Sequence, residues 1–193
     1  DRQMYLFYMT PVAPFLVLAT VLAMGAILGR GERGPTLRIW EWDRPAVIIG
    51  SFQSVRNEVD EQQLLDDMLE IIHLDRTKVY IANIVKCRPP HNRDPQFAEQ
   101  KCCSEWLQRQ IALVDPAIIV CLGRIAATAL IKDPFRITRE HGQWFDVDGR
   151  RYMAIYHPSA LLRDPSKRPE TFVDLKTLQR EIYARCPEVY PDA

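Results

Sequence analysis

The sequence predicts an α/β protein built around a parallel sheet. Residues 79–85 and 117–122 form two short, largely apolar segments, which are typical of strands buried on both faces of such a sheet. Amphipathic helical segments alternate with them, beginning with residues 63–72, where apolar side chains recur at helical spacing. Strands that alternate with helices favour a three-layer arrangement, in which helices cover both faces of the sheet.

Local sequence features predict the remaining elements. Proline disfavours a helical residue before it, so a helix is expected to end before Asp115-Pro116. Gly123 permits a tight turn from a strand into the next helix, and Asp148-Gly149 is typical of a hairpin turn. The expected elements are a helix over 95–114, a helix over 124–131, a hairpin over 143–158 and a final helix over 170–184.

Composition limits the functions that the chain can have. The formal net charge is zero, with 25 basic and 25 acidic residues, so a nucleic-acid partner would have to bind local basic patches. The five cysteines are an odd number, and their positions do not resemble the disulfide framework of a secreted protein. This favours a reducing, cytoplasmic compartment for residues 63–193, with thiols that are free or bound to metal.

The N-terminal residues differ in character from the rest. Residues 3–29 lack charged side chains and are long enough for a helix that crosses a hydrocarbon core of about 30 Å. A signal peptide and a buried helix of a soluble domain are the alternatives. Residues 1–30 also resemble a membrane span of bacterial dolichyl-phosphate-mannose protein mannosyltransferases. The resemblance implies membrane contact but no glycosyl transfer, because that family's catalytic loop has no counterpart here.

Residues 31–62 have the pattern of strands. Residues 36–42 alternate in polarity, and Asp43-Arg44-Pro45 resembles a turn before the apolar residues 46–50, so we expect a hairpin. This segment resembles the opening hairpin of lipoate-protein ligases, which borders the lipoyl-adenylate pocket in that family. That family's glycine-rich loop and catalytic lysine have no counterpart here, so an ordinary edge hairpin is the simpler interpretation.

The stretch Tyr80–Cys103 is the most informative part of the chain. A buried strand leads into a rigid basic loop, CRPPHNRDP, and then into a helix that carries Cys102 and Cys103. The prolines hold the loop extended. Asn83 is expected at the carboxyl end of its strand, where open α/β sheets bind ligands, and its amide offers a donor and an acceptor together. The alternative is a buried asparagine that satisfies neighbouring backbone.

A second string, YHPSALLR over residues 156–163, follows the predicted hairpin. Together with the basic loop it makes residues 63–193 resemble the family 4 (iron–sulfur) uracil-DNA glycosylases. The resemblance implies an α/β domain that hydrolyses the N-glycosidic bond of uracil in DNA. It implies that Asn83 and Ser159 bind the substrate. His157 would be catalytic, because it would donate a hydrogen bond to uracil O2 as the anion leaves.

The same resemblance implies contacts with uracil-containing DNA. Leu161 and Leu162 would fill the gap that a flipped nucleotide leaves, and Arg163 would contact phosphate. On the basic loop, Arg88 and Arg93 are the further candidates for DNA contact. A solvated surface is the alternative interpretation for these arginines.

Members of that family hold a [4Fe–4S] cluster with four thiolates. Cys87 and Cys103 match two of these metal ligands. The Cys-x-x-Cys that supplies the other two has no counterpart, because no cysteine precedes Cys87. We therefore expect that no stable cluster forms.

The family's first motif, Gly-Glu-Ala-Pro-Gly after the first strand, is also absent. Residues 46–54 imitate a strand and a loop but bring no acidic residue, although Glu58 and Asp60 follow soon after. General acid–base assistance is worth about 10²–10⁴-fold in rate, so its loss predicts weak activity or none.

These observations suggest a composite chain of three segments, residues 1–30, 31–62 and 63–193. The last would be a glycosylase-like three-layer unit that is incomplete at its N-terminal side. Two alternatives stay open. One is an active glycosylase whose first strand and loop come from residues 46–54, and the other is a membrane-tethered binding module without enzymatic activity. The sequence does not indicate an oligomeric state.

Overall fold

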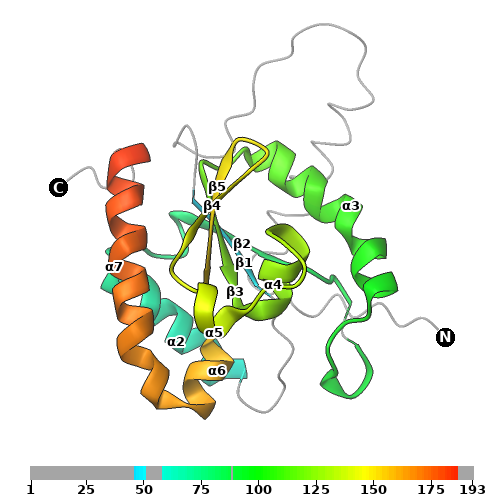
Figure 1. The fold of residues 1–193 in the computed structure, drawn as a ribbon, viewed down its shortest axis with the longest axis horizontal. Helices are drawn as coiled ribbons and strands as arrows, with labels where there is room; N and C mark the ends of the chain where they lie inside the picture. Colours follow the sequence, from blue (N-terminus) through cyan, green and yellow to red (C-terminus); the bar gives the residue numbers. More distant parts are fainter. Residues whose placement is uncertain (1–45, 51–57, 88, 187–193) are drawn as a thin grey trace, which may run out of the picture. The chain divides into compact units, whose positions relative to one another are not determined.

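The computed structural model describes residues 46–50, 58–87 and 89–186. The predicted apolar helix over 3–29 and the predicted strand over 36–42 therefore lie outside the described residues. In the described part the expected mixed α/β architecture is confirmed (Figure 1). No helix in this part is long and apolar enough to cross a membrane.

The elements follow one another as strands and helices in near alternation. In chain order they are β1 (Ala46–Gly50), α2 (Glu58–Ile71), β2 (Val79–Asn83), the 3₁₀ helix η1 (Pro90–Asn92), α3 (Phe97–Val114), β3 (Ile118–Leu122), α4 (Gly123–Leu130), α5 (Ile137–Glu140), β4 (Trp144–Val147), β5 (Arg150–Ile155), α6 (Pro158–Arg163), η2 (Pro165–Lys167) and α7 (Arg168–Arg185).

The five described strands form one sheet in the order β2-β1-β3-β5-β4. Strand β1 pairs in parallel with both β2 and β3, and β3 pairs in parallel with β5. Strand β4 pairs with β5 in the antiparallel sense, through the expected hairpin. Asp148 and Gly149 close this hairpin with φ angles of 50° and 77°, which a turn of this kind requires.

The position of β1 differs from the sequence interpretation. The preferred interpretation placed residues 46–50 in a hairpin separate from the sheet, but they pair on both sides within it, with Ile48 opposite Ile81 and Val120. This pairing agrees with the first strand of the alternative in which residues 46–54 supply the first strand and loop. An uninterrupted apolar run of this kind suits a strand enclosed by neighbours on both sides. The sheet therefore contains a strand from before residue 63, and α2 also begins earlier than expected.

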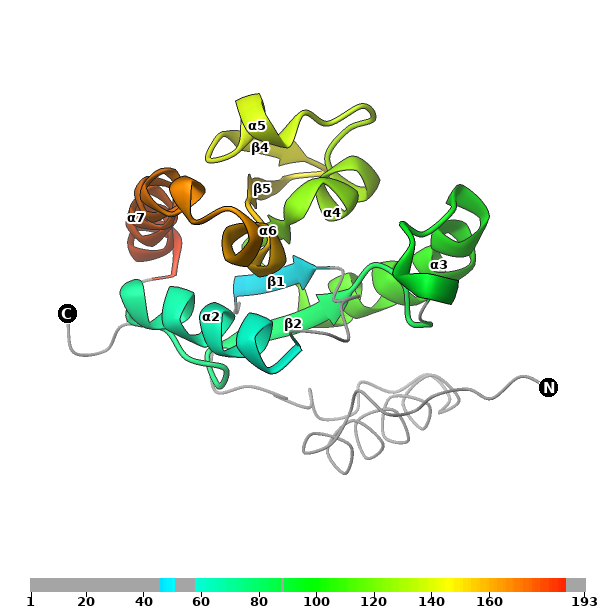
Figure 2. The ribbon, with the colours of Figure 1, turned by 90° about the horizontal axis from the view of Figure 1, so that it is seen from below.

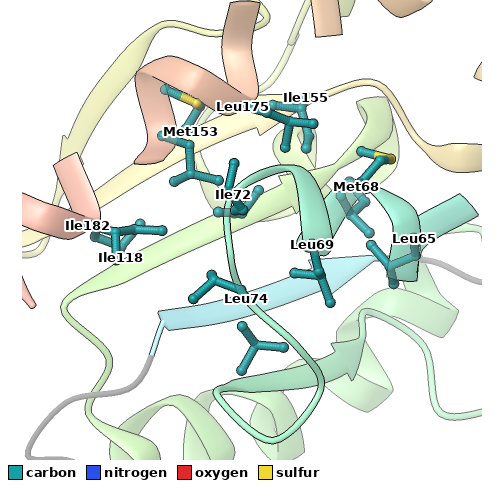
Figure 3. Close-up of a cluster of buried hydrophobic side chains, with 14 of the residues drawn as sticks. Leu65, Met68, Leu69, Ile72, Leu74, Ile118, Met153, Ile155, Leu175 and Ile182 are labelled. Atoms are coloured by element: carbon teal, nitrogen blue, oxygen red, sulfur yellow. The ribbon is translucent and has the colours of Figure 1, made fainter. Parts of the chain in front are cut away.

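The core consists of two clusters of buried apolar side chains that share the sheet. Alternate residues of β3 point to opposite faces, so Ile118 joins one cluster and Ile119 joins the other. The first cluster packs β3 and β5 against α2, α6 and α7, and the second packs the sheet against α3 and α4. Figure 2 shows these two groups of helices on opposite sides of the sheet. Figure 3 shows α2 contributing Leu65, Met68 and Leu69 to the first cluster.

Amide hydrogen exchange will test the position of β1. We expect the amides of residues 46–50 to exchange as slowly as those of β3, because both strands have partners on two sides. The edge strand β4 should exchange faster and serves as the internal control. Exchange of residues 46–50 at the rate of an unstructured peptide would contradict the pairing.

Candidate functional site

The parallel strands end at a common level, which creates one edge for a site. Gly50 is opposite both Asn83 and Leu122, and Leu122 is opposite Ile155. Strands β2 and β5 are separated by β1 and β3, so their ends stand about 14 Å apart, at three strand spacings. Asn83 ends β2, and His157 follows β5 by two residues. Asn83 and His157 therefore lie at the same edge of the sheet, on either side of the ends of β1 and β3.

Asn83 has a polar atom that suits a ligand. Its Oδ1 is buried and accepts no hydrogen bond from any described residue. A buried acceptor without a donor costs about 1–3 kcal/mol, so such atoms are concentrated where function requires them. The amide can accept a hydrogen bond through Oδ1 and donate through Nδ2.

Lys86 fixes the backbone at Asn83. Its Nζ donates to the carbonyl oxygen of Asn83 at 2.8 Å and to Oε1 of Gln110 at 2.6 Å. Gln110 in turn donates to the hydroxyl of Tyr80 at 2.9 Å. Partial desolvation of the ammonium lowers the pKa of Lys86 to about 8, and the electrostatic effect of the Cys103 side chain partly offsets this. The end of β2 is thus joined to α3 by a polar network.

His157 is the N-cap residue of α6, and its ring orientation is fixed by Ser159. The backbone N–H of Ser159 donates to His157 Nδ1 at 3.1 Å, and Ser159 Oγ lies 2.8 Å from the same nitrogen. Because Nδ1 accepts the backbone hydrogen, the neutral imidazole carries its proton on Nε2. The ring therefore presents Nε2–H as a hydrogen-bond donor.

Gly123 allows the close packing around His157. It adopts a φ of +82°, and a Cβ built on it would lie 3.1 Å from the Cβ of His157. A larger residue would strain the backbone and crowd the histidine. The glycine that sequence analysis assigned to a tight turn thus also sets the distance between the β3–α4 corner and His157.

Comparison with known proteins decides the family. Residues 50–178 match the profile of the uracil DNA glycosylase superfamily. The chain belongs to this superfamily. It is 41% identical over 124 residues to the type-4 uracil-DNA glycosylase of Archaeoglobus fulgidus, a match covering 60% of this chain and 62% of that protein.

Other relatives support the same assignment. The type-4 uracil-DNA glycosylase of Thermotoga maritima is 39% identical over 105 residues, or 53% of this chain and 55% of that protein. The type-5 uracil-DNA glycosylase of Pyrobaculum aerophilum is 41% identical over 85 residues, or 43% of this chain and 37% of that protein. The chain thus spans less than two thirds of the length of these glycosylases. None of these matches supports the lipoate-ligase or mannosyltransferase resemblance of residues 1–62.

In the basic loop CRPPHNRDP, Arg93 forms an ion pair. Arg93 makes a two-pronged contact with Glu99, at 2.8 Å and 2.7 Å, and also donates to the Asp94 carbonyl oxygen. This interaction and the backbone N–H of Gln96 hold the pKa of Glu99 at about 2. Arg93 therefore orders the start of α3, while Arg88 lies outside the described residues.

Residues Pro158–Arg163 of the string YHPSALLR form helix α6. Leu161 is only 2% exposed and belongs to the first core cluster, so insertion of its side chain into DNA stays a prediction that would require α6 to move out of the core. The reason for its burial is helical geometry, which points Leu161 into the first core cluster and leaves Leu162 half-buried. Arg163 is exposed and donates to the carbonyl oxygen of Ser159 at 3.2 Å. Leu162 and Arg163 stay candidates for DNA contact.

The described cysteines do not supply a complete set of cluster ligands. Cys87 is exposed, and the half-buried Cys103 accepts a hydrogen bond from the Lys86 backbone at 3.3 Å. The described part of the chain contains no group of three or more His, Cys, Asp or Glu that could hold a metal ion. Cys121 is buried in β3, and burial raises the pKa of its thiol. Two thiolates do not fit a four-thiolate [4Fe–4S] site; the expected lack of a cluster stays a prediction.

A buried carboxylate in the first turn of α2 was not expected from the sequence. Glu61 is 3% exposed, whereas Asp60, which sequence analysis considered, is exposed. The N-terminal end of α2 lies beside α6 in both views (Figures 1 and 2). Glu61 stands one turn before Leu65 on the buried stripe of the helix, so its spacing could have revealed its burial.

Two neighbouring leucines offer a matched test of the α6 geometry. We expect Leu161→Ala to lower the free energy of unfolding by about 2–5 kcal/mol, because it leaves a cavity in the core. Leu162→Ala should cost less than about 1 kcal/mol. Chemical denaturation of both variants measures the difference. Equal losses of stability would contradict the burial of Leu161.

The Arg93–Glu99 pair predicts a dependence of stability on pH. The folded pKa of Glu99 is depressed, so its contribution is fully present above its usual value of 4.5 and is lost as the pH falls through about 2. We expect the stability difference between the wild type and Glu99→Gln to shrink across this interval. Denaturation at several pH values measures it, and a difference that does not change with pH would contradict the ion pair.

Proposed function

We propose that this chain carries a uracil-DNA glycosylase-type domain that recognises uracil in DNA and releases it slowly. The observation that carries the proposal is the presence, on one edge of the sheet, of a buried Asn83 Oδ1 without a donor among the described residues and of a His157 ring held by Ser159. Membership of the superfamily supports the choice of substrate.

Asn83 reads the base in this proposal. Uracil presents an N3–H donor beside the O4 acceptor, and a carboxamide presents the complementary acceptor and donor. The N3–H of uracil would satisfy Oδ1, which no described residue does. The Lys86 network holds the backbone of Asn83, so the amide is oriented before the base arrives.

His157 stabilises the leaving group. When the N-glycosidic bond breaks, negative charge develops on the uracil ring, including O2. The Nε2–H of His157 donates to that oxygen, and a donor oriented in advance is worth about 3–4 kcal/mol to the transition state. Ser159 acts on the substrate through His157, because its N–H and hydroxyl hold Nδ1.

Turnover is slow in this proposal because the chain lacks the family's first motif. The Gly-Glu-Ala-Pro-Gly sequence, which positions water in the family, has no counterpart among residues 46–62. In this proposal β1 takes the place of the strand that precedes the motif, and its pairing with β2 and β3 supports a glycosylase-type unit that begins at or before Ala46. Residues 51–57, which follow β1, are the part of the chain that would have to replace the motif.

DNA would be held through local contacts at this edge. Leu162 and Arg163 lie on α6, which begins immediately after His157. Arg88 belongs to the loop after Asn83. Phosphate contacts release counterions, so binding should weaken steeply as salt increases.

Release of free uracil from a single-stranded uracil oligonucleotide tests the function. We expect slow release by the wild-type chain and a fall to background in His157→Ala, since the donor to O2 is gone. Asn83→Ala should abolish the preference of binding for the uracil oligonucleotide over its thymine counterpart. Ser104→Ala, on the exposed face of α3, is the control and should leave both readouts unchanged.

Two results would contradict the proposal. Equal binding of uracil and thymine oligonucleotides by the wild-type chain, without release, would exclude uracil recognition. Release that survives in His157→Ala would show that another group stabilises the leaving anion.

A further inference from the structure

A largely buried histidine–aspartate pair is separate from the residues assigned to uracil. His141 follows α5, and its Nδ1 donates to Oδ2 of Asp174 on α7 at 2.7 Å. Asp174 is 6% exposed, and burial raises the pKa of its carboxyl, while the hydrogen bond from His141 opposes that effect. The two residues are separated by 33 positions in the chain. Neither belongs to a motif that the sequence analysis identified.

Gly142 makes room for this carboxylate. It adopts a φ of +69°, and a Cβ on it would overlap Oδ1 of Asp174. Its N–H donates to the carbonyl oxygen of Ala154 on β5 at 2.8 Å. The backbone beside His141 is therefore attached to β5, and only glycine allows the approach of Asp174 to it.

The pair packs against the residue that precedes His157. The rings of His141 and Tyr156 have their centroids 4.7 Å apart, at an angle of 40°. Tyr156 is 4% exposed, and Lys167 Nζ lies 5.4 Å from the centre of its ring. Since Tyr156 is covalently joined to His157, the orientation of its ring constrains the backbone that carries the histidine.

Charged groups surround this site from several elements. His141 Nε2 lies 3.5 Å from Oε2 of Glu170 on α7, and Lys167 pairs with Asp164 at 3.2 Å. Glu170, Lys167 and Asp164 are partly exposed, so their ion pairs contribute little net stability. A directional hydrogen bond does, however, fix the position of a ring more strictly than apolar packing does.

We propose that His141 and Asp174 are positioning residues for His157. The pair holds Tyr156 in place, and Tyr156 fixes the β5–α6 corner so that His157 keeps Nδ1 on the Ser159 N–H and its proton on Nε2. This inference rests on the proposed role of His157. A displacement of about 1 Å at a catalytic group can cost about 100-fold in rate, so small movements of this corner matter.

Nuclear magnetic resonance of the histidine rings tests the inference without depending on activity. The protein has four histidines, and the His157 ring signals are identified by their loss in His157→Ala. In the wild type we expect the nitrogen shifts of a single tautomer protonated on Nε2. In Asp174→Leu we expect them to move toward the average of both tautomers, with uracil release falling about 100-fold.

Matched variants separate positioning from general stability. Asp174→Asn keeps an acceptor for His141 and should restore the wild-type His157 signals. Gln179→Leu removes another buried polar group from α7 and should lower stability without moving these signals. If Asp174→Leu does not fold, Gly142→Ala and Gly149→Ala decide. Both glycines have positive φ, but only a side chain at position 142 meets Asp174, so only Gly142→Ala should shift the His157 signals.

Unchanged His157 signals in folded Asp174→Leu or Gly142→Ala would overturn the inference. Shifts of the same size in Gln179→Leu would overturn it too, because they would show a general response to destabilisation. A wild-type chain that releases no uracil but shows the expected ring shifts would reject the proposed function and leave the positioning role intact.

Discussion

The insertion of β1 between β2 and β3 is the constraint on which the rest of the structure depends. Because β1 pairs on both sides, Gly50, Asn83 and Leu122 are aligned across the sheet. Strand β5 is aligned with them through its pairing with β3. Parallel strands with a common register place the following loops at one edge, where α/β proteins bind ligands. Without β1, neighbouring strands would lose their ladder partners and the edge would not be continuous.

This edge holds two groups with complementary chemistry. Asn83 brings a buried acceptor that lacks a donor among the described residues, and His157 brings a ring whose protonated nitrogen is set by Ser159. Neighbouring residues restrict both groups. Lys86 donates a hydrogen bond to the backbone of Asn83, and Gly123 packs closely against His157. The arrangement is oriented before any ligand binds, which is the condition under which donors and acceptors contribute most to recognition and catalysis.

Short-range sequence patterns predicted much of this fold. The apolar strand around Ile119 and the turn at Asp148-Gly149 depend on neighbouring residues, and both are present as expected. The position of β1 depends on partners far along the chain, so periodicity alone assigned it to a local hairpin. The same limit applies to Leu161, because its burial is decided by the core cluster around it and not by the string that contains it.

The candidate site shows the same division. The identities of Asn83 and His157 followed from motifs, whereas the Lys86–Gln110 contact and the His141–Asp174 pair join residues that are 24 and 33 positions apart. No local pattern marks such pairs, and Gly142 signals its role only through the space that Asp174 occupies. Supporting contacts of this kind become visible only when the strands and helices are in place.

The central claim is that a uracil-reading edge survives in a chain without the family's first motif. A titration with a single-stranded uracil oligonucleotide, followed through the Asn83 side-chain amide and the His157 ring by nuclear magnetic resonance, tests it most directly. The account predicts that both sets of signals move together with uracil and not with a thymine oligonucleotide of the same sequence. Signals that stay unchanged, or that respond equally to both oligonucleotides, would contradict it.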